Sequence, residues 1–310
     1  MKNYLIGSNN YALLASYLLS DITIIPTSKF EANNVEPEFL PNTPEIINIV
    51  NSLGLKYKVK ILNAFFDDRG KISTVPSDSF KNVYALSTRG KLAVENSYFE
   101  KFKGSMEYVS IKNKGPFESF YLLFKEIKKN IVLKDMIDSE IDSISVKDSN
   151  IILSDGNILE YKRLIWTGDI KNLDKKLNLF TKKIYVYVCE YNNEADKKMS
   201  NFFSFGYSTG KTYFRTIYLK DKIEYHCMKR TFKDEIDGNK IVNSFNTEQI
   251  IDNLRKTNMY NIDLISMYSQ WNLGYSISQA YRDCKELYEY YNLDKKIGDN
   301  IFKSQQNLLY

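Results

Sequence analysis

Tyr4-Leu5-Ile6-Gly7-Ser8-Asn9-Asn10-Tyr11-Ala12 is the stretch that decides the fold of this chain. Its apolar start stops at Gly7, and apolar residues then recur at helical spacing up to Leu18. A β-branched run at residues 22–25 follows and stops at Pro26. Strand, tight turn, helix and strand in this order form the plan of a dinucleotide-binding βαβ unit, in which a pyrophosphate lies at the N-terminus of the helix.

The turn matches the dinucleotide fingerprint G-x-G-x-x-G/A in part. Gly7 is the first glycine, Ala12 is an accepted variant of the third, and Asn9 replaces the second, which normally lets a phosphate come close. A carboxylate for the ribose is expected at the end of the second strand, where residues 26–28 are uncharged instead. An ordinary strand-to-helix turn is the alternative interpretation. The candidates for a pyrophosphate turn are Gly7, Ser8, Asn9, Asn10, Tyr11 and Ala12.

Composition excludes several classes of function. The net charge of +5, from 43 basic and 38 acidic residues, is too small for 310 residues to indicate nucleic-acid binding. No run approaches the roughly 18 apolar residues of a membrane span, and no signal peptide is visible. Three distant cysteines without a CxxC pair favour a reducing cytoplasm. The single histidine, His226, removes most Ser-His-Asp and His-metal mechanisms, and we expect it to be structural.

The rest of the chain alternates between helical and extended patterns. We expect strands at 56–66, 131–133, 140–146, 151–153, 158–161, 164–166 and 264–268, and helices at 43–53, 88–102, 115–128, 247–255 and 277–291. Residues 182–230 are mostly aromatic and β-branched, which predicts an antiparallel sheet in a second domain. Thr43 is the expected N-cap of the second helix, and Ser276 or Ser278 that of the last helix.

Four further features are candidates for a site. Thr167 and Gly168 end a buried strand at the carboxyl edge of the sheet, where open α/β folds bind ligands. Arg215 could hold a phosphate or carboxylate with its planar fork, or form a surface ion pair. The segment before the last helix, Trp271, Asn272, Leu273 and Gly274, could line an anion or isoalloxazine site. Tyrosines could wall a substrate cavity or simply be core: Tyr185, Tyr187, Tyr213 and Tyr218.

Taken in order, these blocks resemble the glutathione-reductase-like flavoproteins, a superfamily with flavin amine oxidases, protoporphyrinogen oxidase and UDP-galactopyranose mutase. The mutase version is the most similar at Arg163–Ile170 and Thr212–Tyr218. The resemblance implies an α/β fold, an FAD/NAD(P)-binding Rossmann-like domain with an inserted, mainly antiparallel β substrate domain. It places the FAD-binding-like domain at 1–60, 105–175 and 245–310, and the substrate or cap domain at 61–104 and 176–244.

The resemblance also implies site residues. Ile141 matches the position that contacts adenine, Thr167 and Gly168 match the turn near the flavin, and Arg215 matches the arginine that binds substrate phosphate in the mutases. The family's Gly-Gly loop is missing at residues 30–35, and Tyr268-Ser269 replaces its Gly-Arg pair.

The expected function is that of an FAD-dependent oxidoreductase acting on a small amine or a sugar-nucleotide-like substrate. One alternative is a UDP-sugar mutase that uses reduced flavin. Another is a flavin-free binding protein on the same scaffold, as the Rab GDP-dissociation inhibitors are. The partner is then a small molecule rather than nucleic acid, the location is cytoplasmic, and the oligomeric state stays open.

Overall fold

A computed structural model describes residues 1–19, 22–27, 39–87, 105–131, 136–168, 173, 181–191, 194–220, 222–227, 240–245, 261–266 and 276–291. The chain forms two compact units. Unit 1 comprises Met1–Lys58, Val109–Leu179 and Thr247–Tyr310, and unit 2 comprises Val59–Tyr108 and Phe180–Asn246. The helices expected at 88–102 and 247–255, most of the strand at 131–133 and the segment 271–274 lie outside the described residues.

Unit 1 is built on a mixed sheet in which the N-terminal strand lies inside. The strand order is β2 (Thr23–Ile25), β1 (Lys2–Ile6), β8 (Ile158–Trp166), β7 (Asn150–Leu153) and β6 (Ile141–Ser145), and β14 (Ile262–Leu264) also pairs with β8. β1 is parallel to β2 and to β8, and β14 is parallel to β8. β6, β7 and the first half of β8 form an antiparallel meander.

The prediction of separate strands at 158–161 and 164–166 is wrong, because β8 runs through both ranges without a break. The polar residues between them do not interrupt the strand. Arg163 forms a two-point ion pair with Asp263 on the neighbouring strand β14. The strand therefore continues through polar residues that had indicated its end, because it pairs with a segment that is distant in sequence.

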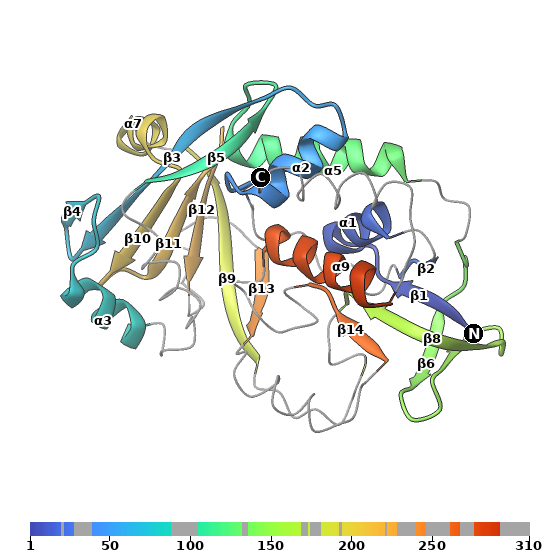
Figure 1. The fold of residues 1–310 in the computed structure, drawn as a ribbon. Coiled ribbons are helices and arrows are strands. Elements are labelled where there is room, and N and C mark those ends of the chain that lie inside the picture. Colours follow the sequence, from blue (N-terminus) through green and yellow to red (C-terminus); the bar gives the residue numbers. More distant parts are fainter. Residues whose placement is uncertain are drawn as a thin grey trace. The chain divides into compact units, whose positions relative to one another are not determined.

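In the part of the chain that the structure describes, four helices share an apolar core with this sheet: α1 (Asn10–Leu18), α2 (Pro44–Ser52), α5 (Pro116–Asn130) and α9 (Ile277–Tyr291). In Figure 1, α1 and α9 lie side by side, and α1 also packs against α5. One apolar core joins the helices to the strands, with fully buried Leu14, Ile49, Leu123, Ile165 and Tyr281 among its members. The core places the N-terminus of α1 at the end of β1.

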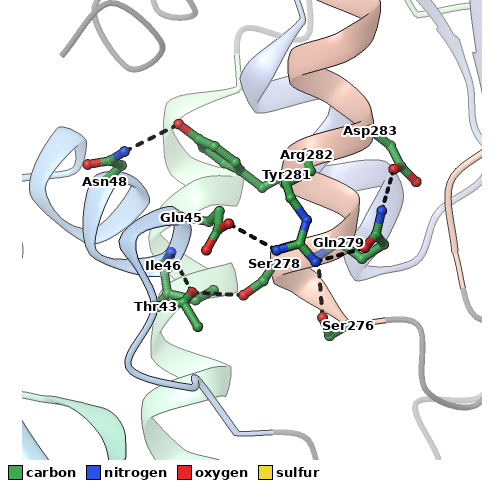
Figure 2. Close-up of polar contacts among 10 residues, drawn as sticks. All are labelled: Thr43, Glu45, Ile46, Asn48, Ser276, Ser278, Gln279, Tyr281, Arg282 and Asp283. Atoms are coloured by element: carbon green, nitrogen blue, oxygen red, sulfur yellow. Dashed lines mark hydrogen bonds and ion pairs between the residues drawn. The ribbon is translucent and has the colours of Figure 1, made fainter. Parts of the chain in front are cut away.

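A polar seam joins α2 to α9 (Figure 2). Thr43 is the N-cap of α2, as expected, and its hydroxyl lies 2.9 Å from that of Ser278. Arg282 donates to Glu45 across the same seam at 3.1 Å. Because two different kinds of polar contact join the N-terminal parts of these helices, the start of α9 is held against the start of α2.

Unit 2 is a second sheet, in which β10 pairs with β3 in parallel and the pairs β10–β11, β11–β12, β12–β9, β9–β13 and β3–β4 are antiparallel. Its strand order is β13 (Lys240–Phe245), β9 (Thr181–Glu190), β12 (Lys222–Cys227), β11 (Tyr213–Tyr218), β10 (Phe205–Thr209), β3 (Tyr57–Asp68) and β4 (Lys71–Ser73), and β5 (Ser105–Ile111) pairs with β3. Neither α3 (Asp78–Ser87) nor α7 (Glu194–Phe202) was expected from the sequence. α7 has no fully buried residue, although its apolar Ala195, Met199 and Phe202 recur at helical spacing and Met199 packs against a small apolar cluster of unit 2.

Candidate functional site

The β1–α1 turn is packed directly onto the end of β8. Gly7 has a φ of +142°, and a Cβ atom built there would lie 1.9 Å from Thr167 Oγ1. The Thr167 hydroxyl donates to the Ile6 carbonyl at 3.0 Å, and the Thr167 amide donates to the same carbonyl at 3.1 Å. Gly7 is therefore required for the contact between two parallel strand ends, whether or not a phosphate binds beside it.

Asn9 is the N-cap of α1 and is only 5% exposed. Its Oδ1 accepts a hydrogen bond from the Ala12 amide at 2.9 Å, and its Nδ2 donates to the Thr167 carbonyl at 2.6 Å. The backbone is extended, with φ −84° and ψ 178°, so this position does not need glycine for conformational reasons. The structure thus shows what replaces the second glycine of the fingerprint: a buried carboxamide that bridges the helix N-terminus and β8.

The ends of three parallel strands meet at this point. Ser266, just after β14, donates to the Thr167 carbonyl at 2.8 Å, and the Ile265 amide donates to the Trp166 carbonyl at 3.0 Å. Ser266 was not among the expected site residues, because it lies inside the strand expected at 264–268. A serine interrupting an apolar run was the available signal.

Thr27 lies at the end of β2, where the sequence lacks the expected ribose carboxylate. Its amide donates to Ser8 Oγ at 3.0 Å, so it lies against the β1–α1 turn. Thr27 is only 5% exposed, and within the described part of the chain its hydroxyl has no hydrogen-bond partner. A buried hydroxyl without a partner costs roughly 1–3 kcal/mol, which a ligand with a complementary polar group would recover.

The other expected residues of unit 1 are placed as follows. Gly168 follows Thr167 at the end of β8, and a Cβ there would lie 3.1 Å from the Trp166 ring. Ile141 begins β6, which is separated from β1 by β7 and β8 in the sheet order. The four residues 271–274 lie outside the described part. Beyond them Ser276 caps α9, since its hydroxyl accepts from the Gln279 amide at 3.3 Å (Figure 2).

In unit 2, Arg215 is bound to the only histidine of the chain. A register shift between Tyr213 and Arg215 forms a bulge in β11, and Arg215 lies opposite His226 on β12. Arg215 Nη2 lies 3.0 Å from His226 Nδ1, and His226 Nε2 lies 3.4 Å from Glu224 Oε2. Because a guanidinium only donates, Nδ1 accepts and the imidazole carries its proton on Nε2. Arg215, His226 and Glu224 thus form one polar chain, in which His226 and Glu224 are buried and Arg215 is half-buried.

This arrangement predicts the tautomer of His226. The fully buried ring should be neutral with a proton on Nε2, since protonation of Nδ1 would break the bond from Arg215. Because the chain has one histidine, a long-range ¹H–¹⁵N spectrum reports on it without ambiguity. We expect the Nε2–H pattern at pH 7 in the wild type and a mixture of tautomers in Arg215→Gln. An Nδ1–H pattern in the wild type would contradict the assignment.

The tyrosines expected to wall a cavity or fill a core lie in two environments. Tyr187 and Tyr218 are buried, and Tyr218 belongs to a small apolar cluster with Phe65 and Ile223. Tyr185 and Tyr213 are half-buried. Burial, followed by the nearby charge of Asp196, raises the pKa of Tyr218 far above its ordinary value. The tyrosine hydroxyl is therefore held protonated at any physiological pH.

The described residues contain no group of three His, Cys, Asp or Glu side chains placed to hold a metal ion. None of the helices in these residues combines the length and the apolar character needed to cross a membrane.

Known structures share this fold at very low sequence identity. Reduced UDP-galactopyranose mutase matches with a TM-score of 0.60 and 8% identity over 97% of this chain and 97% of that one. The A394C mutant of putrescine oxidase matches at 0.53 and 8% over 93% and 99%, and a CLA-producing fatty acid isomerase from P. acnes at 0.53 and 12% over 94% and 98%. No protein-family model matches the sequence, and neither does any curated protein sequence.

These likenesses define the class of fold. The chain has the fold of the FAD/NAD(P)-binding Rossmann-like proteins of the glutathione-reductase type, with an inserted, mainly antiparallel β domain, which confirms the expected fold class. The expected structural relationship to amine oxidases and UDP-galactopyranose mutase is confirmed at the level of the fold. At 8 to 12% identity, the likeness does not extend to a substrate or a reaction.

Proposed function

We propose that the chain is an FAD-dependent oxidoreductase of the amine oxidase/UDP-galactopyranose mutase-like type, acting on a small amine or a sugar-nucleotide-like substrate. In this proposal unit 1 is the cofactor domain and unit 2 is the substrate domain. The observation that carries it is the buried hydroxyl of Thr27 beside the β1–α1 turn, which has no hydrogen-bond partner among the described residues. In this fold the end of the second strand is where an adenosine ribose is recognised.

The end of β2 and the N-terminus of α1 suit an adenine dinucleotide, whereas the side chain of Asn9 opposes it. Thr27 Oγ1 can exchange a hydrogen bond with a ribose hydroxyl, a role usually filled by a carboxylate. The N-terminus of α1 favours the charge of a pyrophosphate. Asn9 opposes pyrophosphate binding, because its side chain already accepts the hydrogen bond of the Ala12 amide. FAD therefore fits this turn once the Asn9 side chain has moved.

The remaining contacts follow from the same assignment. Gly7 to Ala12 would face the pyrophosphate, Ile141 the adenine, and Thr167 with Gly168 the flavin side, together with Trp271, Asn272, Leu273 and Gly274 ahead of α9. A bound flavin would supply a hydride acceptor, which demands no side-chain base and suits a chain with one histidine. Arg215, oriented by His226, would hold the anionic part of a substrate.

Two other functions have an observation in their favour. Arg215 on an inner strand of unit 2 suits a UDP-sugar mutase, in which it would hold the diphosphate while reduced flavin serves the isomerisation. The internally bonded Asn9 suits a flavin-free binding protein on the same scaffold, since it satisfies the helix N-terminus without a ligand.

Visible absorption with added FAD tests the proposal, and Thr27→Val sharpens it. We expect the purified protein to take up about one FAD per chain. Because Thr27→Val removes an unsatisfied hydroxyl, the unfolding midpoint should stay unchanged or rise. FAD binding should weaken about five- to tenfold, because the variant loses one hydrogen bond to the cofactor. No uptake of FAD at millimolar concentration would support the flavin-free binding protein instead.

A further inference from the structure

The position of the second fingerprint glycine is filled by a side chain that competes for the same N–H group as a phosphate. Asn10, Tyr11 and Ala12 are the first three residues of α1, and Asn9 Oδ1 accepts from the third amide at 2.9 Å. An anion at a helix N-terminus binds through these first-turn amides. The amide of Ala12 cannot serve Asn9 and a pyrophosphate oxygen in the same geometry.

The opposite end of the carboxamide is held equally firmly. Asn9 Nδ2 donates to the Thr167 carbonyl at 2.6 Å, and that carbonyl also accepts from Ser266. Both partners are buried main-chain groups, and Asn9 itself is 5% exposed. Its orientation is fixed by chemistry, since only the oxygen can accept from an amide N–H and only the NH₂ group can donate to a carbonyl.

We infer that Asn9 sets the affinity of this turn for nucleotides: its carboxamide is a built-in substitute for the pyrophosphate, and FAD binds only when both of its hydrogen bonds are given up. This inference deepens the proposed function and rests on it. It makes the cofactor exchangeable rather than permanently held, because each binding event must displace the Asn9 side chain.

Three substitutions at Asn9 separate its effects. Asn9→Gly removes both hydrogen bonds and empties the space, and its extended backbone suits glycine without strain. We expect FAD to bind this variant about 30-fold more tightly, which corresponds to two hydrogen bonds of about average strength. Asn9→Ala should lie between it and the wild type, because its Cβ remains. Asn9→Asp keeps the acceptor, adds a negative charge beside the phosphates, and should bind more weakly than the wild type.

Thr43→Gly is the matched control. It removes the N-cap of α2, a helix of the same length as α1, outside the β1–α1 turn. We expect it to lower stability as Asn9→Gly does, while leaving FAD affinity as in the wild type. Equal gains in affinity from both substitutions would overturn the inference, since a general loosening of unit 1 would then explain them.

Inorganic pyrophosphate and amide exchange provide readouts that do not depend on flavin. The Ala12 amide should be protected from hydrogen exchange in the wild type and in Thr43→Gly, and should exchange faster in Asn9→Gly. Pyrophosphate should shift the Ala12 resonance of Asn9→Gly at lower concentration than that of the wild type. If it does and no variant binds FAD, the flavin function fails and the inference about Asn9 stands. If FAD binds the wild type as tightly as Asn9→Gly, the flavin function stands and the inference fails.

Discussion

Replacing Gly7 by alanine should destabilise unit 1 by about 3 kcal/mol or more, one of the largest effects expected from a single methyl group in this chain. Two costs add at this position. The φ of +142° is strained for any residue with a side chain, and the new Cβ would lie 1.9 Å from Thr167 Oγ1. Thr167 cannot move aside cheaply, since its hydroxyl, amide and carbonyl are all hydrogen-bonded.

Urea denaturation followed by tryptophan fluorescence measures this loss, because both tryptophans of the chain belong to unit 1. Gly54→Ala is the control: its φ is +65° and none of the described residues would lie within 4 Å of its new Cβ, so it should lose only about 1 kcal/mol. Thr167→Ala removes the clashing oxygen, and Gly7→Ala should be less damaging in that background. Equal losses from Gly7→Ala and Gly54→Ala would refute the close approach seen between Gly7 and Thr167.

The parts of unit 1 that the sequence predicted well are those with a local cause. The βαβ unit follows from a change of apolar period within 25 residues, and the helix at 277–291 has the bounds that were expected. Thr43 was identified as an N-cap from its chemistry alone. In each case the deciding residues are neighbours in sequence, so propensity and periodicity are sufficient.

The parts that the sequence could not predict depend on pairing between distant segments. Asn9 and Thr167 are 158 positions apart, and Ser266 reaches Thr167 from 99 positions away. The sequence shows that position 9 has asparagine where the fingerprint has glycine. It does not show that this asparagine binds the end of β8. The fingerprint calls for a carboxylate after β2, so Thr27 did not stand out in the sequence; its importance arises from a buried hydroxyl that has no partner among the described residues.

Gly206→Ala should damage unit 2 in the same way that Gly7→Ala damages unit 1, but through an aromatic ring. Gly206 on β10 pairs with Phe65 on β3, and the Phe65 ring lies across the glycine. A Cβ at Gly206 would lie 2.3 Å from Phe65 Cζ. The ring is 6% exposed and packs against Phe203 and Tyr218, with centroids at 5.2 and 6.2 Å. It therefore has little room to rotate, and we expect a loss of about 3 kcal/mol.

Hydrogen exchange of peptides from β10 and β11 measures this loss within unit 2, where no tryptophan reports. Phe65→Leu supplies the decisive comparison, because leucine lacks the ring atoms that the new Cβ would meet. If the ring is the obstacle, Gly206→Ala should lose at least about 1 kcal/mol less in the Phe65→Leu background than in the wild type. An unchanged loss would mean that the backbone of β10, rather than the Phe65 ring, requires glycine. Gly70→Ala, with a φ of +95° and nothing within 4 Å, gives the size of a purely conformational loss in the same unit.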